Sequence, residues 1–360
     1  MGLILPSFLT RAQAPLLGID FGASSVKVVE LIPGRQSAMR LESYALEPLE
    51  RGAIVDGNVE KPEAVADALL RALRRAGTKT RTVALALPSS SVISKRITLP
   101  AGLREDDYEL QVESEASQYI PFAIEEVSLD YQILGPSASS LDEVDVLLTA
   151  SRKEKVDDRV AVAEMAGLKP MIMDVESYAA RGSIDHIASY LPDHGEGLIL
   201  AVFDIGMLAT GLTMVLDGQT IFERQQAFGG NQLTQDIVLL YGLPAEEAEI
   251  RKRTGDLPDN FEEELLHPFV DQAATEISRA LQFFFTSTLH TRIDRIFLAG
   301  GSAVTPGLCD AVAQRTKVET EVLSPFQGME ISSTVREKQM RLDAPAMLVS
   351  CGLAMRRFDA

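Results

Sequence analysis

Two short motifs with an aspartate two residues before a glycine stand about half the chain apart, at Asp20-Phe21-Gly22 and Asp204-Ile205-Gly206. A glycine in such a turn lets backbone N–H groups approach a ligand closely and form a concave site for phosphate oxygens. An aspartate at a strand end can hold Mg²⁺ through water, because this ion keeps much of its hydration shell. The two motifs together therefore favour a site for a Mg²⁺-bound phosphate ester, although either turn alone is common in ordinary hairpins.

Further glycine and charged residues occur in the second half of the chain. The apolar run 296–299 leads into Gly300-Gly301-Ser302, where glycines would allow a flat base to lie against the backbone. A second glycine pair, Gly229-Gly230, precedes a predicted helix, and Glu249 and Lys252 lie three residues apart on one helical face. Each feature alone is also typical of an ordinary turn or of a solvated helix face.

Both Asp-x-Gly motifs lie between apolar segments that predict strands. Leu16–Asp20 and Val26–Ile32 surround the first motif, and Leu198–Phe203 and Thr210–Leu216 surround the second. Both copies have the order strand, Asp-x-Gly, short loop, strand, and their separation is far longer than the repeat of a solenoid. The sequence therefore predicts a duplication that forms two homologous lobes facing each other.

The other periodic segments predict an α/β architecture with an α+β insertion in the first lobe. Apolar residues at helical spacing predict helices at 61–76, 103–119, 155–166, 244–253 and 271–289. Apolar or alternating runs predict strands at 82–87, 129–134, 144–150 and 170–175, and residues 295–312 predict a strand, a turn and a helix.

Composition limits the classes of partner and the compartment. The 360 residues include 34 basic and 52 acidic side chains, and the net charge of −18 disfavours binding to nucleic acid. Cys309 and Cys351 match neither a disulfide framework nor a metal motif, and no apolar run reaches the ~20 residues of a membrane-spanning helix. We therefore expect a cytoplasmic protein. The apolar residues 1–9 lack a preceding positive charge, so we expect a contact segment or a disordered start rather than a secretory signal.

The order of these motifs resembles that of the actin, heat-shock chaperone and sugar kinase superfamily: phosphate loop, connecting segment, second phosphate loop, ribose-contacting helix and adenosine loop. Within it, the chain most resembles the PilM family of actin-like type IV pilus assembly proteins, which is related to the cell-division protein FtsA. The resemblance rests on Gly18–Leu31, on Gln118–Phe122 with Leu129-Asp130-Tyr131, and on Ala166–Pro170 with Asp174-Val175-Glu176.

The resemblance implies an actin-like ATPase fold of the α/β class, with two homologous, ribonuclease H-like lobes and an FtsA-type α+β insertion subdomain. The first lobe would span residues 1–175 and contain the insertion at 82–156. The second lobe would span residues 176–335, and residues 336–360 would form a C-terminal helix that returns to the first lobe.

The resemblance also implies a site for ATP and Mg²⁺. Its cofactor-binding residues would be Asp20, Gly22, Ser24, Ser25 and Lys27 in the first phosphate loop; Asp204, Gly206 and Thr210 in the second; Gly229, Gly230, Glu249 and Lys252 near the ribose; and Gly300, Gly301 and Ser302 at the adenosine. Asp20 and Asp204 would hold Mg²⁺ through water, and Asp204 and Glu176 would be the catalytic residues. The second loop departs from the family pattern at Met207-Leu208-Ala209. We therefore expect ATP to be a structural or regulatory ligand that is hydrolysed slowly.

The implied function is that of a cytoplasmic component of the type IV pilus inner-membrane assembly platform, attached peripherally to the membrane through its partners. The expected partner is a PilN-like bitopic protein, whose N-terminal peptide would lie between the first-lobe core and the insertion, together with other platform proteins. A sugar or acid kinase of the same superfamily is one alternative, although the chain has no separate sugar signature. An FtsA-like filament former is another, although the last residues form no amphipathic membrane helix. The sequence leaves open whether the protein forms a homo-oligomer.

Overall fold

The computed structural model describes residues 14–35, 38–138, 140 and 142–359, so the expectation for residues 1–9 lies outside the described part. The chain divides into two compact units. The first consists of the chain up to Val28, Ala45–Ala179 and the residues from Arg356 onward, and the second consists of Val29–Tyr44 and Ala180–Met355.

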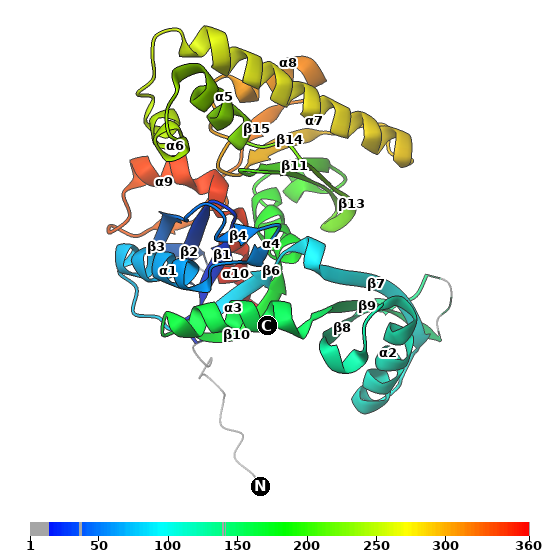
Figure 1. Ribbon diagram of the computed structural model, residues 1–360. Helices are drawn as coiled ribbons and strands as arrows, with labels where there is room; N and C mark the ends of the chain where they lie inside the picture. Colours follow the sequence, from blue (N-terminus) through cyan, green and yellow to red (C-terminus); the bar gives the residue numbers. More distant parts are fainter. Residues whose placement is uncertain (1–13, 36–37, 139, 141, 360) are drawn as a thin grey trace. The chain divides into compact units, whose positions relative to one another are not determined.

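A six-stranded sheet has the order β10-β6-β1-β2-β3-β16 (Figure 1). Its strands are β1 (Leu17–Phe21), β2 (Ser25–Pro33), β3 (Met39–Pro48), β6 (Thr82–Leu87), β10 (Lys169–Val175) and β16 (Glu330–Ile331). β6 pairs in parallel with both β1 and β10. Every residue of β6 from Val83 onward is buried, because a strand inside a covered parallel sheet has apolar neighbours on both faces.

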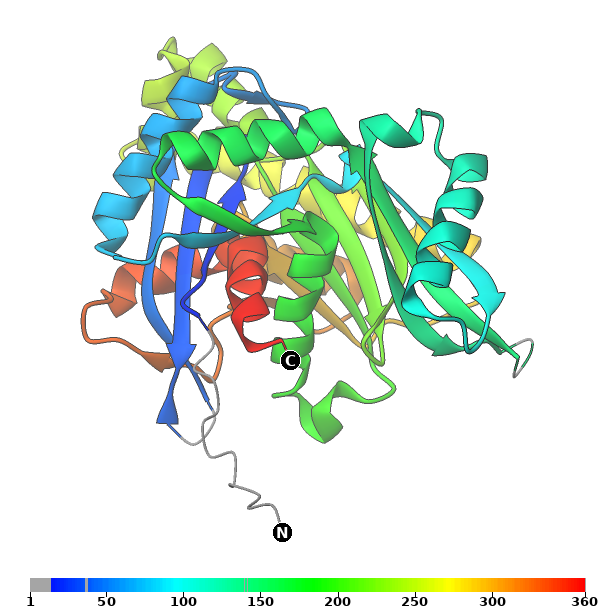
Figure 2. The ribbon, with the colours of Figure 1, turned by 90° about the horizontal axis from the view of Figure 1, so that it is seen from below.

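Two helices cover one face of this sheet in the first unit, α1 (Pro62–Ala76) and α3 (Lys153–Met165), and they lie side by side in Figure 2. Val65, Leu69 and Leu73 of α1 pack into one core cluster with β1, β6 and α3. Gly77 ends α1 with a φ of 69°, and its N–H donates to the Leu73 carbonyl. The predicted helix at 61–76 is therefore confirmed. A short hairpin of β4 (Ile54–Val55) and β5 (Asn58–Val59) precedes it.

A separate three-stranded antiparallel sheet has the order β7-β9-β8. Its strands are β7 (Val92–Pro100), β8 (Val127–Pro136) and β9 (Glu143–Arg152), and α2 (Glu105–Tyr119) packs on one of its faces. This subdomain begins at Val92 rather than at the predicted insertion start, Thr82, since β6 belongs to the six-stranded sheet. The apolar sequence of β6 suits that central position and would be unusual in a half-exposed insertion.

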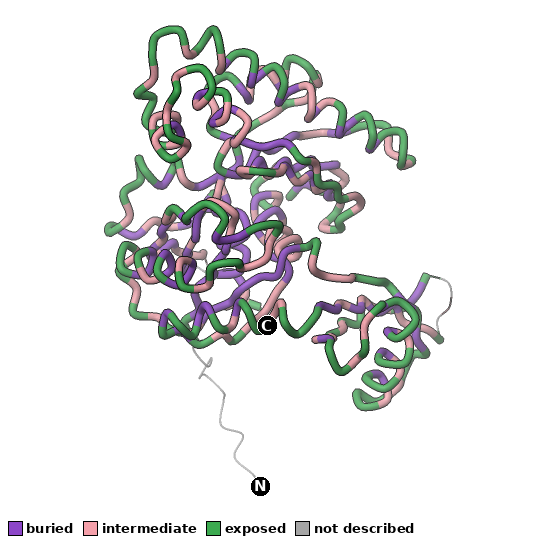
Figure 3. Tube along the Cα trace, in the orientation of Figure 1, coloured by how far each residue is buried: buried purple, intermediate pink, exposed green. Residues whose placement is uncertain are grey.

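The second unit contains a five-stranded sheet in the order β13-β12-β11-β14-β15. Its strands are β11 (Ile199–Ile205), β12 (Thr210–Leu216), β13 (Gln219–Gln226), β14 (Arg295–Ala299) and β15 (Thr320–Val322). Alternate residues of β11 point to opposite faces: Ile199, Ala201 and Phe203 join one core cluster, and Leu200 and Val202 join another. Figure 3 colours the buried parts of the chain purple. The first cluster includes α7 (His267–Ser287) and α8 (Leu308–Thr316), and the second includes α4 (Glu176–Ala188) and α10 (Leu348–Met355).

The remaining helices are α5 (Asn231–Tyr241), α6 (Ala245–Thr254) and α9 (Glu337–Asp343). α7 begins four residues before the predicted start and follows a π-helical stretch, Glu262–Leu266. Pro268 is tolerated there because the N–H groups in the first turn of a helix have no acceptor within the helix, so the missing N–H of a proline costs no hydrogen bond. In the described part of the chain, no helix has the length and apolar character needed to span a bilayer.

Candidate functional site

In the second unit, backbone hydrogen bonds hold the second Asp-x-Gly turn against the glycine pair that precedes α5. The Gly230 N–H donates to the Gly206 carbonyl over 3.0 Å, and the Asn231 N–H donates to the Met207 carbonyl over 2.9 Å. A Cβ atom on Gly229 would lie 2.5 Å from the Met207 carbonyl oxygen. Only glycine fits at this position without a shift of the backbone, so the pair packs closely against the turn.

Ser302 joins these segments from the turn after β14. Its N–H donates to the Ile205 carbonyl over 3.1 Å, and a Cβ atom on Gly230 would lie only 2.2 Å from its Oγ. Gly300 has a φ of +87°, and a Cβ atom there would lie 2.5 Å from Oδ1 of Asp204. The turn at 204–206, the glycine pair and the 300–302 turn therefore form one compact group, which we call the loop cluster.

The Glu249–Lys252 pair of α6 lies at the loop cluster. Lys252 Nζ lies 2.6 Å from Glu249 Oε2, and it donates to Thr234 Oγ1 over 2.8 Å and to the Gly230 carbonyl over 3.1 Å. The Thr234 hydroxyl donates to Glu249 Oε2 over 2.6 Å. The structure therefore brings the predicted ribose pair and the predicted glycine pair together, with Thr234 of α5 as a buried link that the sequence reasoning missed.

Burial and charge oppose each other in this pair. Burial lowers the pKa of Lys252, against the attraction of Glu249. Burial alone would raise the pKa of Glu249. The charge of Lys252, the hydrogen bonds from Lys252 and Thr234, and the charge of Arg253 together outweigh burial and lower the pKa. Glu249 is therefore held as a carboxylate, a group that accepts hydrogen bonds from sugar hydroxyls.

Gly301 differs from the other glycines of the loop cluster because the space around it is open. No atom lies within 4 Å of a Cβ atom built on Gly301, and the residue is exposed. A flat ring can lie against backbone where no side chain intervenes. The open surface at Gly301, with the Glu249 carboxylate at the same cluster, fits the nucleoside part of a nucleotide.

Thr210 has a different place from the one its predicted role suggests. Its hydroxyl is buried in β12 and donates to the Phe228 carbonyl over 2.7 Å. This bond ties β12 to the segment that leads into the glycine pair. The hydroxyl thus has a partner in the protein and supports the loop cluster rather than pointing to solvent.

In the first unit, Asp20 and Lys27 form an ion pair at the turn between β1 and β2. Lys27 Nζ lies 2.6 Å from Asp20 Oδ2, and the two side chains are 15% and 8% exposed. The Gly22 N–H donates to the Ser25 carbonyl over 3.0 Å, and the Leu49 N–H donates to the Ser24 carbonyl over 2.9 Å. A Cβ atom on Gly22 would lie 3.0 Å from Lys27 Nζ. Gly22 therefore leaves room for the lysine, whose charge suits a phosphate group.

Arg159 of α3 is a charged residue of this region that the sequence reasoning missed. It is only 1% exposed, and its guanidinium donates to the Ala86 and Gly57 carbonyls, each over 2.8 Å. Burial lowers the pKa of Arg159, whereas the charges of Glu176 and then Asp20 favour its protonated form. A buried cation thus interacts with two of the predicted acidic site residues.

Glu176 begins α4 directly after β10. The Ser177 N–H donates to Ser89 Oγ over 3.2 Å, and the Tyr178 hydroxyl donates to Ser94 Oγ over 2.6 Å. These bonds fix the start of α4 to the segment that enters the three-stranded sheet. The two candidate catalytic residues belong to different units, Glu176 to the first and Asp204 to the second.

The predicted metal ligands are single carboxylates and not a cluster of protein side chains. Among the residues that the structure describes, no group of three or more His, Cys, Asp or Glu side chains could hold a metal ion. Mg²⁺ is usually bound by one or two carboxylates together with water and phosphate oxygens. A single carboxylate such as Asp20 in the first unit, or Asp204 in the second, could contact such an ion through water.

Comparisons with known proteins identify the family and the fold. A family model described as type IV pilus assembly protein PilM matches residues 18–358. A solved chain described as a PilM–PilN type IV pilus biogenesis complex is 27% identical, with a TM-score of 0.78 over 97% of this chain and 100% of that chain. The ethanolamine utilization protein EutJ from Carboxydothermus hydrogenoformans is 14% identical, with a TM-score of 0.57 over 94% and 88%. MreB5 of Spiroplasma citri bound to ADP is 14% identical, with a TM-score of 0.50 over 97% and 100%. The predicted actin-like ATPase fold is thereby confirmed.

Proposed function

The chain belongs to the PilM family of actin-like type IV pilus assembly proteins, and we propose that it acts at the cytoplasmic face of the inner membrane by binding a PilN-like bitopic protein. The observation that carries the proposal is the 27% identity over 97% of this chain to a protein solved in a PilM–PilN complex. Attachment through such a partner suits a chain whose described helices cannot span a membrane. The net charge of −18 suits a basic cytoplasmic peptide.

Within the first unit, we propose that the partner's N-terminal peptide binds where the three-stranded subdomain joins α4. Tyr178 stands at this junction, with its hydroxyl 2.6 Å from Ser94 Oγ of β7 and 3.5 Å from Thr149 Oγ1 of β9. Such hydroxyls can exchange partners with the N–H and C=O groups of an extended peptide.

A photoreactive peptide with a PilN-like N-terminal sequence should therefore label residues 82–179 of the full-length protein. Mass spectrometry would locate the labelled segments. The Tyr178→Phe variant, which lacks only the hydroxyl, should reduce the yield several-fold. Tyr241→Phe, which removes a hydroxyl bonded to Asn260 in the second unit, is the matched control and should leave the yield unchanged. Labels confined to residues 180–335 would refute this location.

We also propose that the loop cluster binds the nucleoside of ATP, with Glu249 accepting a ribose hydroxyl and the base lying at Gly301. In the first unit, the phosphate oxygens would be bound by Gly22, Ser24, Ser25 and Lys27. The bound nucleotide would supply binding energy that stabilises the folded units by mass action. In the first unit, Asp20 would contact the Mg²⁺ that accompanies the nucleotide, through water.

The Gly301→Glu substitution should weaken ATP binding by about a hundredfold or more, because a bulky anion would occupy the open surface that the base needs. Isothermal titration calorimetry would give both affinities. Gly182→Glu is a matched control, since a Cβ atom on Gly182 also meets no atom within 4 Å and neither glycine has a positive φ. Equal affinity of the Gly301→Glu variant and the parent would show that the base binds elsewhere.

A further inference from the structure

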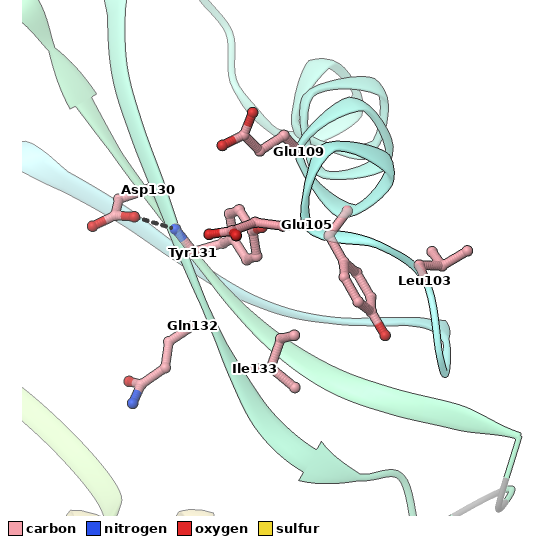
Figure 4. A pocket seen from close by; sticks show the side chains of 8 residues that line it. Leu103, Glu105, Glu109, Asp130, Tyr131, Gln132 and Ile133 are labelled. Carbon is pink, nitrogen blue, oxygen red and sulfur yellow. Dashed lines mark hydrogen bonds between the residues drawn. The ribbon is translucent and has the colours of Figure 1, made fainter. Parts of the chain in front are cut away.

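A groove of about 590 Å³ lies between α2 and β8 in the first unit (Figure 4). β8 is an edge strand, because the three-stranded sheet has the order β7-β9-β8. Three carboxylates line the groove, those of Glu105 and Glu109 on α2 and that of Asp130 on β8. None of the described residues that line it is basic.

The groove has a negative potential that the described protein does not neutralise. No described residue forms an ion pair with Glu105, Glu109 or Asp130, and the neighbouring Arg104 pairs with Asp107 instead. Desolvation raises the pKa of the Tyr131 hydroxyl, and the charges of Glu109, Glu105 and Asp130 raise it further. A cationic ligand would therefore be attracted to this surface.

The spacing of the carboxylates matches an extended chain. Glu105 and Glu109 are one helical turn apart, which places their Cβ atoms roughly 5–6 Å from each other. Alternate side chains of a strand point to the same side and are roughly 6.6 Å apart. Two basic side chains at alternate positions could therefore meet both carboxylates at once.

Tyr131 and Ile133 give the same groove an apolar part. Ile133 is 44% exposed, and Tyr131 lines the same groove as Glu105 (Figure 4). The aliphatic stems of Lys and Arg pack on such surfaces, and a tyrosine ring attracts a nearby cation. The lining therefore offers contacts to the whole length of a basic side chain and not only to its charge.

The outer edge of β8 can also bind a peptide backbone. An edge strand carries N–H and C=O groups that face away from its sheet and can pair with an added strand. The Tyr131 N–H of β8 donates to Asp130 Oδ1 over 2.8 Å, a bond that a paired peptide would replace. The β-bulge between Ile133 and Gly135 limits regular pairing to the residues before it. A second copy of this chain would bring the same acidic residues to the edge, and like charges opposite each other disfavour that pairing.

We propose that this groove binds an extended, basic segment of another protein, which pairs with β8 and places alternate Lys or Arg side chains against Glu105 and Glu109. This surface shares no residue with the Tyr178 junction proposed for the PilN-like peptide. It therefore gives the protein a second docking surface, for a partner segment with alternating basic and apolar residues.

The test uses the full-length protein and three fluorescein-labelled heptapeptides in fluorescence anisotropy. One alternates four Lys with three Val, one has the same composition with the Lys residues in a block, and one alternates Glu with Val. The alternating Lys peptide should bind at least several-fold more tightly than the block peptide, and the Glu peptide should not bind. Equal binding of the two Lys peptides, or no binding of the alternating one, would overturn the proposal.

Paired variants separate the groove from the overall charge of α2. The double variant Glu105→Gln/Glu109→Gln should weaken binding of the alternating Lys peptide about tenfold. Asp106→Asn/Glu113→Gln removes the same charge from exposed positions of the same helix that do not line the groove, and it should weaken binding less than twofold. Equal losses in both double variants would mean that only long-range attraction operates, which would overturn the proposal.

Hydrogen exchange distinguishes this surface from the proposed PilN site. The alternating Lys peptide should slow exchange of amides in residues 129–133, and saturation with the PilN-like peptide should not remove this protection. Protection at residues 176–179 instead would overturn the groove proposal and leave the proposed function standing. Failure of the PilN crosslinking experiment alone would leave the groove proposal intact.

Discussion

Replacing Arg159 with alanine is expected to lower the free energy of unfolding of the first unit by roughly 2–6 kcal/mol, at about 1–3 kcal/mol for each of the two buried carbonyls that loses its donor. The side chain is 1% exposed, so water cannot easily take its place. Its loss would leave the Ala86 and Gly57 carbonyls without their donor. It would also remove a positive charge that interacts favourably with the charges of Glu176 and Asp20.

Urea denaturation, monitored by the hydrogen exchange of amides in α1 and α3, would measure this loss of stability in the first unit. Arg75→Ala is the matched control, because Arg75 is in the same unit but its side chain is 62% exposed in its ion pair with Glu47. An exposed pair of this kind contributes less than about 1 kcal/mol. A cost of that size for Arg159→Ala would mean that the buried charges around it are already balanced by other groups.

The main elements of the fold follow from the sequence where burial dominates. The strands β11 and β14 are mostly apolar, as is typical of strands covered on both faces, and both were predicted within two residues. Helix α1 was predicted because an apolar stripe, an early proline and a final glycine all agree. The local sequence is sufficient to predict these elements because their apolar residues are buried, whichever chain segment packs against them.

The differences occur where the outcome depends on distant segments. β6 was assigned to the insertion because its sequence does not reveal its partners, and only the pairing with β1 and β10 places it in the larger sheet. Arg159 stands in a predicted amphipathic helix, where an arginine normally faces water. Its two acceptors are backbone carbonyls far along the chain. Every residue has a backbone carbonyl, so the sequence does not reveal which ones accept from Arg159.

The candidate site shows the same limit. The motif order, through the family resemblance, selected Gly229, Gly230, Glu249, Lys252 and Ser302, and the structure brings these five residues together. The motif order could not reveal which hydroxyls already have partners. The hydroxyls of Thr210 and Thr234 have the same chemistry in the sequence, but packing commits one to the Phe228 carbonyl and the other to Glu249.

Phosphate release from ATP is expected to stay below about one per minute, far under the ~1–100 s⁻¹ typical of kinases. Phosphoryl transfer depends on donors aimed at the charge that develops in the transition state, and losing one commonly costs ~10²-fold or more in rate. The second loop presents Leu208, which is 48% exposed and has no polar group in its side chain. The neighbouring Met207 adds only a carbonyl that already accepts the Asn231 N–H.

Binding of ATP should be affected much less than turnover, because the loop cluster, Lys27 and the first phosphate loop do not depend on these two side chains. ATP at a hundred times its dissociation constant would stabilise the folded protein by about 2.7 kcal/mol, enough for a clear rise in melting temperature. The decisive experiment therefore measures the melting temperature and phosphate release on one sample. Asp20→Ala should abolish the rise if the first phosphate loop holds the phosphates. Phosphate release at kinase-like rates would contradict the slow-turnover prediction. Fast ADP formation that requires a sugar, without phosphate release, would favour a kinase, because the phosphoryl group would then be transferred to the sugar hydroxyl.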